Sequence, residues 1–486
     1  MGIFKKLLQQ TFIYGLATVL PRALAIFLVP LYVTVLGTAQ YGIYAALMAF
    51  LILGNVLLAY GMETAFFRFI NKENAKKERV QSTALTSIAL STFLFLMISL
   101  SLSEPLAEFL NFKTEYVIYG LLILALDALA IIPFVWFRAN EKPMKYAVIK
   151  ILSVCINLGF NLFFFLILPT WASRESASFW AGMYSEENKV AYVFIANLIA
   201  SGITLLILAP LYIKIKFRFD KLIWKQMLKY AVPVLIAGVA FSINEAFDKI
   251  LLRYLLPPNI ADAEVGVYSA CYKLGVFMTL FGTAFRLGIE PFFFKHASHQ
   301  NAKQNYATIT KYFSIFGSAI LLFVVVYIDL FKRILIPEPS FWEALKIVPI
   351  ILLANLCLGI YHNLSVWYKV SDQTKYGAMI SVVGAMITLG LNFLLIPQIS
   401  YVGSAIATLA AYASMMTISY LLGQQKYAVP YDVKRIGLYL LLAISFAGVS
   451  YYIFNQNLVI GSALLLVFLL IVYISEKREI KALLKK

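Results

Sequence analysis

The chain has 486 residues, of which 62% are hydrophobic and only 13% are charged. A water-soluble globular protein cannot bury so large an apolar share, so this composition excludes a soluble enzyme or binding protein and predicts an all-α integral membrane protein. The net charge of +17 would suggest a nucleic-acid partner in a soluble protein. The three cysteines lie in apolar runs without metal-ligand spacing, so we expect no metal site and no cofactor.

Apolar segments long enough to cross a bilayer follow one another along the whole chain. A spanning helix needs about 20 apolar residues. About fourteen segments meet this length, at residues 11–36, 42–67, 80–102, 116–137, 146–168, 190–213, 230–255, 265–290, 307–331, 344–368, 376–396, 400–422, 436–454 and 457–475.

The loop charges predict the orientation of these helices. With both termini in the cytoplasm, most cations fall in inner segments and the outer segments carry acids, as the positive-inside rule requires. The inner cations include Lys72, Lys76, Lys77, Arg79, Arg138, Lys142, Lys145, Lys214, Lys216, Arg218, Lys221, Lys225, Lys229, Lys295, Lys303, Lys426, Lys434, Arg435 and the tail from Lys477. The outer acids include Glu104, Glu108, Glu175, Glu186, Glu187, Asp262 and Glu264. One missed helix would place every later loop on the wrong side of the membrane, so the alternation supports the helix count. Because topology accounts for most of the positive charge, no nucleic-acid partner is needed to explain it.

The sequence also repeats itself. Leu158-Gly159-Phe160-Asn161 is echoed by Leu389-Gly390-Leu391-Asn392, and other matches keep the same order at offsets between 227 and 231 residues. We therefore expect two parallel six-helix lobes related by a pseudo-twofold axis, as in transporters that rock two lobes about a central cavity. The expected parts are an N-lobe (1–213), a basic cytoplasmic linker (214–229), a C-lobe (230–422), and a segment with the last two helices and a basic tail (423–486). The linker suits either an amphipathic helix on the inner leaflet or a solvated connection.

Ionisable side chains at membrane depth are the main functional clue. Each costs at least about 2.5 kcal/mol on insertion scales, so we expect them to face a bundle interior or a wet cavity. Arg22, Asp127 and Lys273 lie near the middle of expected helices. Because Arg22 and Lys273 have no helical neighbour of opposite sign, they need an anionic partner, and a phosphate or pyrophosphate would serve.

The seventh expected helix carries a row of charges at spacings of three and four. Glu245, Lys249 and Arg253 either neutralise one another or line a central cavity, and we expect the second. The predicted substrate-binding residues of that cavity are Arg22, Lys249, Arg253, Lys273 and Arg286. Asp127, Glu245 and Asp248 are expected either to form fixed salt bridges or to couple transport to H⁺ or Na⁺.

Several short motifs give the chain a family resemblance. Leu36-Gly37-Thr38-Ala39-Gln40-Tyr41-Gly42-Ile43-Tyr44, then Val265-Gly266-Val267-Tyr268, then Gly403-Ser404-Ala405-Ile406-Ala407 appear in an order that resembles the polysaccharide-transporter family of the multidrug, oligosaccharidyl-lipid and polysaccharide exporter superfamily. The resemblance implies the fold of that superfamily and a flippase that moves an oligosaccharide linked to polyprenyl pyrophosphate from the cytoplasmic to the periplasmic leaflet. It also implies coupling to an ion gradient, and Arg22 matches a mid-helix cation of lipid-linked sugar flippases.

On this basis we expect a monomeric, non-enzymatic protein of the bacterial inner membrane that serves polysaccharide or O-antigen biosynthesis. A flippase for peptidoglycan lipid precursors is the closest rival, because it shares the helix number and a cationic cavity. A multidrug exporter of the same superfamily fits less well, because those exporters have fewer helices and an acidic cavity. A membrane glycan polymerase or ligase is the alternative of a different class, but no catalytic group of residues is visible.

Overall fold

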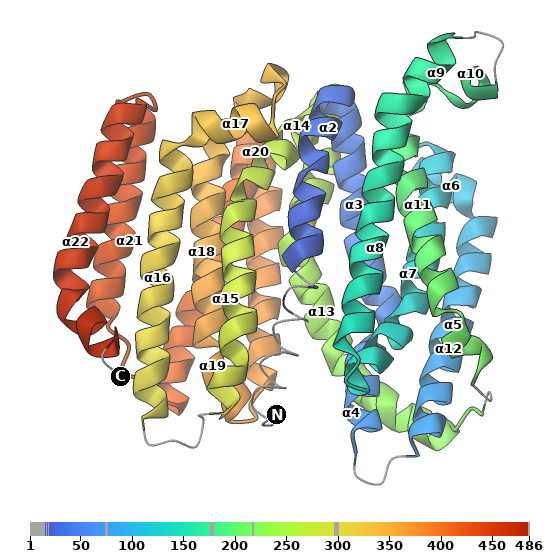
Figure 1. Cartoon of the computed structure of the whole chain (residues 1–486), viewed down its shortest axis with the longest axis horizontal. Helices are drawn as coiled ribbons and strands as arrows, with labels where there is room; N and C mark the ends of the chain where they lie inside the picture. The colour runs from blue at the N-terminus through green and yellow to red at the C-terminus, as the bar shows by residue number, and fades with distance from the viewer. Residues whose placement is uncertain are drawn as a thin grey trace. The chain divides into compact units, whose positions relative to one another are not determined.

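The structure is a computed structural model, and it describes residues 15, 17, 19–72, 76–174, 179–215, 218–295 and 301–484 (Figure 1). The described residues form helices and connecting turns only, without strands. Up to residue 272 the elements are α2 (Leu28–Val35), α3 (Thr38–Ala59), α4 (Met62–Ile70), α5 (Lys77–Ser101), α6 (Ser103–Phe109), α7 (Thr114–Ala139), α8 (Pro143–Leu162), η1 (Phe163–Ile167), α9 (Leu168–Arg174), α10 (Phe179–Met183), η2 (Glu186–Asn188), α11 (Lys189–Leu208), α12 (Pro210–Ile213), α13 (Lys221–Leu255) and α14 (Pro258–Tyr272). The later elements are η3 (Lys273–Gly275), α15 (Val276–Lys295), α16 (Ala302–Val326), α17 (Ile328–Leu335), η4 (Pro339–Ile347), α18 (Val348–Leu364), α19 (Val366–Val370), α20 (Lys375–Lys426), α21 (Val433–Gly448), η5 (Val449–Ile453) and α22 (Leu458–Leu484).

The helices confirm a multi-pass membrane protein. Twelve helical segments of the described chain are long and apolar enough to cross a bilayer. One of them, α20, consists of two helices that meet at Ile399 and Ser400, where the backbone leaves the helical region. A shorter apolar helix, Val19–Val35, lies where the first span is expected. The expected segments thus each have a helical counterpart. The expected start at residue 11, the inner Lys216, the outer Glu175 and the last two residues of the tail lie outside the described residues.

The chain packs as two compact units, Met1–Gly266 and Val267–Lys486. The first unit takes in the basic linker and the whole of α13, which runs without interruption from Lys221 to Leu255. The second half of the linker is therefore the start of the seventh spanning helix. Asp220 caps this helix by accepting hydrogen bonds from the amides of Leu222 and Ile223. The division into two six-helix lobes rests on the sequence repeat and stays a prediction.

The repeated asparagines occupy similar environments in the two units. Asn161 in α8 and Asn392 in α20 are both fully buried. The Oδ1 atom of Asn161 accepts a hydrogen bond of 2.8 Å from the hydroxyl of Tyr32, and that of Asn392 accepts one of 2.7 Å from the hydroxyl of Ser404. A buried amide is costly unless it is hydrogen-bonded, so each repeat keeps a residue that ties its helix to a neighbour.

Two glycines let α3 and α14 touch backbone to backbone within the first unit. A Cβ atom on Gly42 would lie 1.7 Å from the carbonyl oxygen of Asp262, and one on Gly266 would lie 1.9 Å from that of Thr38. No other residue type can occupy either position at this helix separation, because any side chain would overlap a carbonyl group. Both glycines belong to the motifs on which the family resemblance rests.

The second spanning segment is broken where α3 meets α4. Tyr60 and Gly61 both have left-handed backbone angles, with φ of +31° and +72°. A Cβ atom on Gly61 would also lie 2.3 Å from the carbonyl oxygen of Ala231 in α13. Glycine at this position therefore serves both the turn and the close approach to α13.

We expect Gly61→Ala to lower the free energy of unfolding by at least about 1–2 kcal/mol, since a left-handed alanine is strained and its methyl group meets Ala231. The measurement is thermal unfolding of the purified protein in detergent. Gly159→Ala is the matched control, because Gly159 lies inside α8 with open space around it, and its midpoint should equal or exceed that of wild type. A Gly61→Ala protein as stable as the control would contradict the backbone geometry described here.

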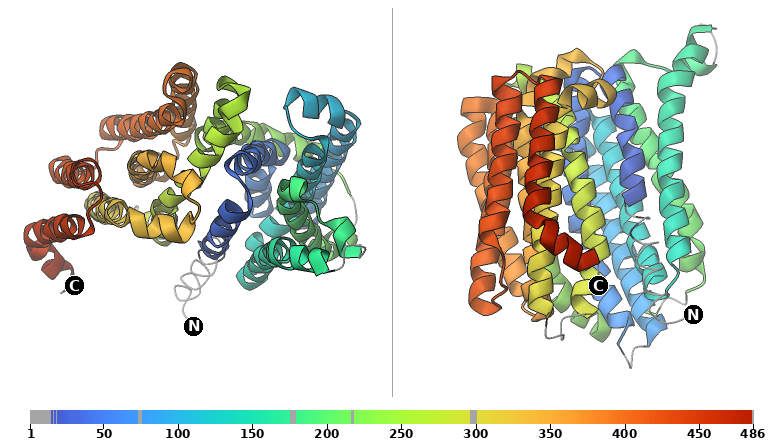
Figure 2. Two further views of the ribbon diagram at one scale, coloured as in Figure 1. Left: turned by 90° about the horizontal axis from the view of Figure 1, so that it is seen from above. Right: turned by 60° about the vertical axis from the view of Figure 1, so that its left-hand side comes forward.

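A buried ion cluster holds the last two helices to the second unit. α16, α21 and α22 pack side by side (Figure 1 and Figure 2). Between them Lys311 Nζ lies 2.7 Å from Glu476, which has no exposed surface and also accepts hydrogen bonds from Tyr439 at 2.8 Å and Arg435 at 3.2 Å. Because a lone carboxylate is too costly to bury, these partners fix how α21 and α22 dock.

Candidate functional site

The structure separates the charges that the sequence places in one row on α13. Glu245 is exposed, whereas Asp248 is buried with only 3% of its side chain accessible. Lys249 folds back onto Asp248, with its Nζ 2.9 Å from the carboxylate, and keeps 16% of its side chain exposed. Asp248 and Lys249 are thus an ion pair of adjacent residues, and the cation keeps only a small accessible face.

Arg253, at the end of α13, has a set of contacts unlike that of a cavity residue. Its Nε atom donates to the Asp262 carboxylate at 2.6 Å, and its two terminal nitrogens donate to the carbonyls of Leu110 at 3.1 Å and Asn111 at 2.7 Å. The guanidinium group also covers the ring of Phe112 at 3.7 Å. The two carbonyls follow the end of α6, where a helix leaves unpaired acceptors that favour a cation. Arg253 therefore joins α13 to α14 and to the loop after α6.

Arg22 and Lys273 are both exposed and belong to different units. Arg22 lies in the Val19–Val35 helix of the first unit. Lys273 begins η3, a 3₁₀ turn that interrupts the spanning segment Pro258–Ile289 near its middle. A 3₁₀ turn inside a long helix often marks a functional position.

In the second unit Arg286 lies with two further basic side chains in a narrow pocket. Arg286 comes from α15, His362 from α18 and Lys369 from α19, and all three line the pocket. Asn363, which is 5% exposed, lines the same pocket, and its Oδ1 has no hydrogen-bond partner among the described residues. The side chain of Glu290, one turn beyond Arg286, lies outside the described residues. Within the described part of this pocket, which has a volume of about 20 Å³, Arg286 and Lys369 are the two cations.

Asp127 is held in a polar environment inside the first unit. Its carboxylate in α7 accepts a hydrogen bond of 2.8 Å from the hydroxyl of Ser201 in α11, and Asn55 of α3 and Lys150 of α8 also face it. Lys150 in turn lies over the ring of Phe134 at 4.2 Å. Four helices thus bring a carboxylate, an ammonium and two neutral polar groups together at membrane depth.

These groups line a pocket of about 450 Å³ that continues toward the end of the unit where the basic loops lie. Glu63 of α4 and Arg138 of α7 also line it, and they form an exposed ion pair of 3.0 Å. Because Glu63 and Arg138 are ionisable, this part of the pocket is polar, and the same pocket extends to Asp127. Such a carboxylate can bind a proton or a small cation, and it is chemically distinct from the basic pocket of the second unit.

Sequence reasoning missed several of these groups. Lys150 could have been predicted, because it is a lysine inside an apolar segment, which is the same signal that identifies Arg22 and Lys273. His362 and Lys369 lie near a helix end, where cations normally report only orientation, so the sequence holds no signal that separates them from other loop cations. Ser201 and Asn55 are ordinary residues of spanning helices, and only the fold brings them to Asp127.

Comparison with known proteins identifies both a family and a fold. The family model described as "Polysaccharide biosynthesis protein" matches residues 7–281, more than half of the chain. A search of curated protein sequences gives no match.

Several solved transporters of low sequence identity share the fold. The lipid II flippase MurJ in an inward closed conformation is 17% identical, with a TM-score of 0.70 over 96% of this chain and 99% of that one. An inward-facing multidrug resistance MATE family transporter of the MOP superfamily is 12% identical, with a TM-score of 0.62 over 88% and 95%. A MOP superfamily transporter from Pyrococcus furiosus is 14% identical, with a TM-score of 0.59 over 89% and 95%. These likenesses confirm the expected fold.

Proposed function

The chain belongs to the polysaccharide biosynthesis protein family, and from this premise we propose that it is a flippase for a lipid-linked oligosaccharide. In this proposal the cargo is linked to polyprenyl pyrophosphate and moves from the cytoplasmic to the periplasmic leaflet of the bacterial inner membrane by alternating access, for polysaccharide or O-antigen synthesis. The protein acts as a monomer and makes or breaks no covalent bond. The observation that carries the proposal is the family match together with the MOP fold.

The charges at membrane depth support an anionic cargo. Arg22, Lys249, Lys273 and Arg286 are the proposed ligands of the pyrophosphate, because guanidinium and ammonium groups replace the water that a phosphate loses in the membrane. Arg253 is assigned a positioning role, because its donors are already engaged.

The carboxylates support the proposed coupling of transport to an ion gradient. Asp127 is the proposed site at which a proton or Na⁺ is coupled to transport, because a polar pocket leads to it. Asp248 and Glu245 are secondary candidates, and Asp248 is already paired with Lys249.

Leaflet transfer in proteoliposomes tests this function. The purified protein is reconstituted with labelled lipid-pyrophosphate oligosaccharide, and the fraction accessible to an added sugar-modifying reagent is followed with time. We expect transfer by wild type, and transfer near the level of protein-free liposomes for Arg22→Ala and Lys273→Ala. Lys346→Gln, which removes an exposed lysine of η4, is the control and should transfer normally.

Two outcomes would contradict the proposal. Transfer by both variants at the wild-type rate would remove the cationic binding site. Transfer of a peptidoglycan lipid precursor, with no transfer of the oligosaccharide lipids, would assign the chain to the rival cargo.

A further inference from the structure

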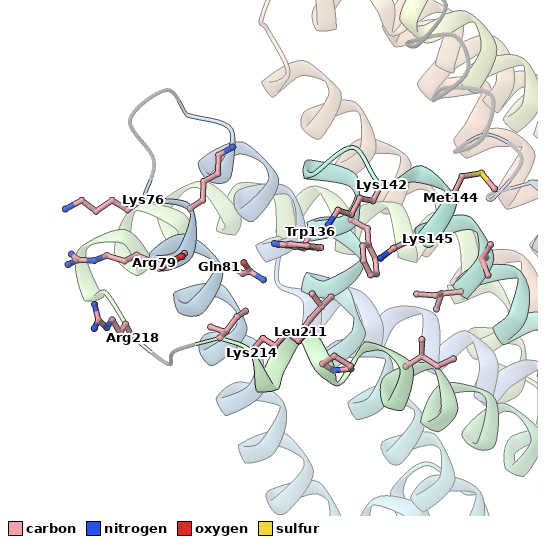
Figure 3. A pocket seen from close by; sticks show the side chains of 18 residues that line it. Lys76, Arg79, Gln81, Trp136, Lys142, Met144, Lys145, Leu211, Lys214 and Arg218 are labelled. Carbon is pink, nitrogen blue, oxygen red and sulfur yellow. The ribbon is translucent and has the colours of Figure 1, made fainter.

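One large pocket of the first unit is lined by none of the proposed cargo ligands. It has a volume of about 1260 Å³ and lies at the end of the unit where the basic loops meet, between α5, α7, α8 and α12. Seven of its 18 lining residues are Lys or Arg and one is acidic. Figure 3 shows Lys76, Arg79 and Arg218 on one side of it and Lys142 and Lys145 on the other.

The positive-inside rule explains why cations gather at this end of the unit, but it does not explain why two of them lie at the starts of helices. Lys76 is the N-cap residue of α5 and Lys142 that of α8, and neither makes a side-chain capping hydrogen bond. The start of a helix carries partial positive charge and unpaired amides, so a cation there is unfavourable unless an anion is close. By contrast α13, which begins nearby, is capped by Asp220. Glu78 in the first turn of α5 supplies part of this compensation, whereas the first turn of α8 contains no acidic residue.

The positive charge of the pocket is only partly neutralised by the described residues. Arg79 lies 3.8 Å from Asp220, and both side chains are partly exposed. Lys142 lies over the ring of Trp136 at 4.5 Å, in a cation–π contact. Cations and two helix starts that converge on one concavity form a site for a phosphate.

One wall of the same pocket is apolar and accessible. Met144 and Val148 of α8 are 59% and 55% exposed, and Ile207 of α11 is 40% exposed. All three belong to helices that are apolar and long enough to cross the membrane. A lipid of the surrounding bilayer can contact both surfaces at once, with its phosphate among the cations and an acyl chain against the wall.

We propose that this pocket binds the headgroup phosphate of an anionic glycerophospholipid from the adjoining leaflet, with an acyl chain along Met144, Val148 and Ile207. None of the proposed cargo ligands lines this pocket, so the inference does not depend on the proposed function. Because Ser82 and Thr83 of α5 already bind the amides of Arg218 and Asp220, a lipid at this position would hold the connection that leads into α13.

Lipid titration of the full-length protein in detergent tests the site. Phosphatidylglycerol is added and bound lipid is counted by native mass spectrometry, with thermal unfolding as a second readout. We expect phosphatidylglycerol to bind and to raise the unfolding midpoint, and the double variant Lys142→Gln/Lys145→Gln to bind at least about tenfold more weakly. Phosphatidylcholine and glycerol 3-phosphate should each bind much more weakly than phosphatidylglycerol.

Two further variants separate the pocket from general charge. Lys225→Gln/Lys229→Gln removes the same charge from exposed positions on α13 outside the pocket, and should bind phosphatidylglycerol as wild type does. Val148→Trp fills the apolar wall without a change of charge and should weaken binding. Equal loss in the two lysine double variants, undiminished binding by Val148→Trp, or binding of glycerol 3-phosphate as tight as that of the lipid would each overturn the proposal.

Discussion

Arg253→Met is expected to lower the free energy of unfolding by about 3 kcal/mol, the lower end of the range for breaking a buried ion pair. The substitution keeps most of the side-chain volume but removes every donor to Asp262 and to the carbonyls of Leu110 and Asn111. The Arg253 side chain is only 6% exposed, so water has little access to the acceptors that the substitution leaves unpaired. The Asp262 side chain is 28% exposed, so its carboxylate can regain part of its hydration. Thermal unfolding in detergent measures the effect.

Two companion variants make this result specific. Arg253→Lys keeps the charge but loses the planar set of donors, so we expect an intermediate midpoint. Glu245→Gln, on the exposed side of the same helix, should unfold as wild type does. An Arg253→Met protein with wild-type stability and no transport would return Arg253 to the cavity predicted from the sequence.

Arg253 also shows where prediction from sequence stops. Within α13 the nearest charges are Lys249, Asp248 and Glu245, so helical spacing suggests partners on the same helix. The true partner, Asp262, lies beyond the turn that ends α13, and the carbonyl acceptors are more than 140 residues away in sequence. Spacing rules describe neighbours within a helix, and they hold no information about which helix end packs against another.

The fold itself was largely predictable, because its signals are long or repeated. A stretch of about 20 apolar residues identifies each spanning helix, and the alternation of loop charge constrains the number of helices along the whole chain. Asn161 and Asn392 were identified by their repeated context, and both are buried and hydrogen-bonded. In the sequence Gly42 and Gly266 appear only as members of short motifs. A close approach of two backbones has no sequence signal other than the glycine itself.

Asp127→Asn is expected to reduce gradient-driven transfer of the cargo to near the level of protein-free liposomes. The substitution keeps the shape of the side chain, and its amide oxygen can still accept the hydrogen bond from Ser201, so the fold should be preserved. What it removes is the ability to carry a negative charge and to take up a proton or a cation in the pocket shared with Lys150 and Asn55. Proteoliposomes with an imposed H⁺ or Na⁺ gradient measure the effect.

Glu63→Gln is the matched control for Asp127→Asn, because the two carboxylates line the same pocket. The Glu63 side chain is 50% exposed and pairs with Arg138, whose side chain is 42% exposed, so this surface ion pair is well solvated and contributes little to stability. We expect Glu63→Gln to respond to the gradient as wild type does. If Asp127→Asn kept that response and Glu63→Gln lost it, the coupling group would lie at the open end of the pocket. If both kept it, the pocket would have a structural role, and coupling would have to be sought at Asp248 in α13.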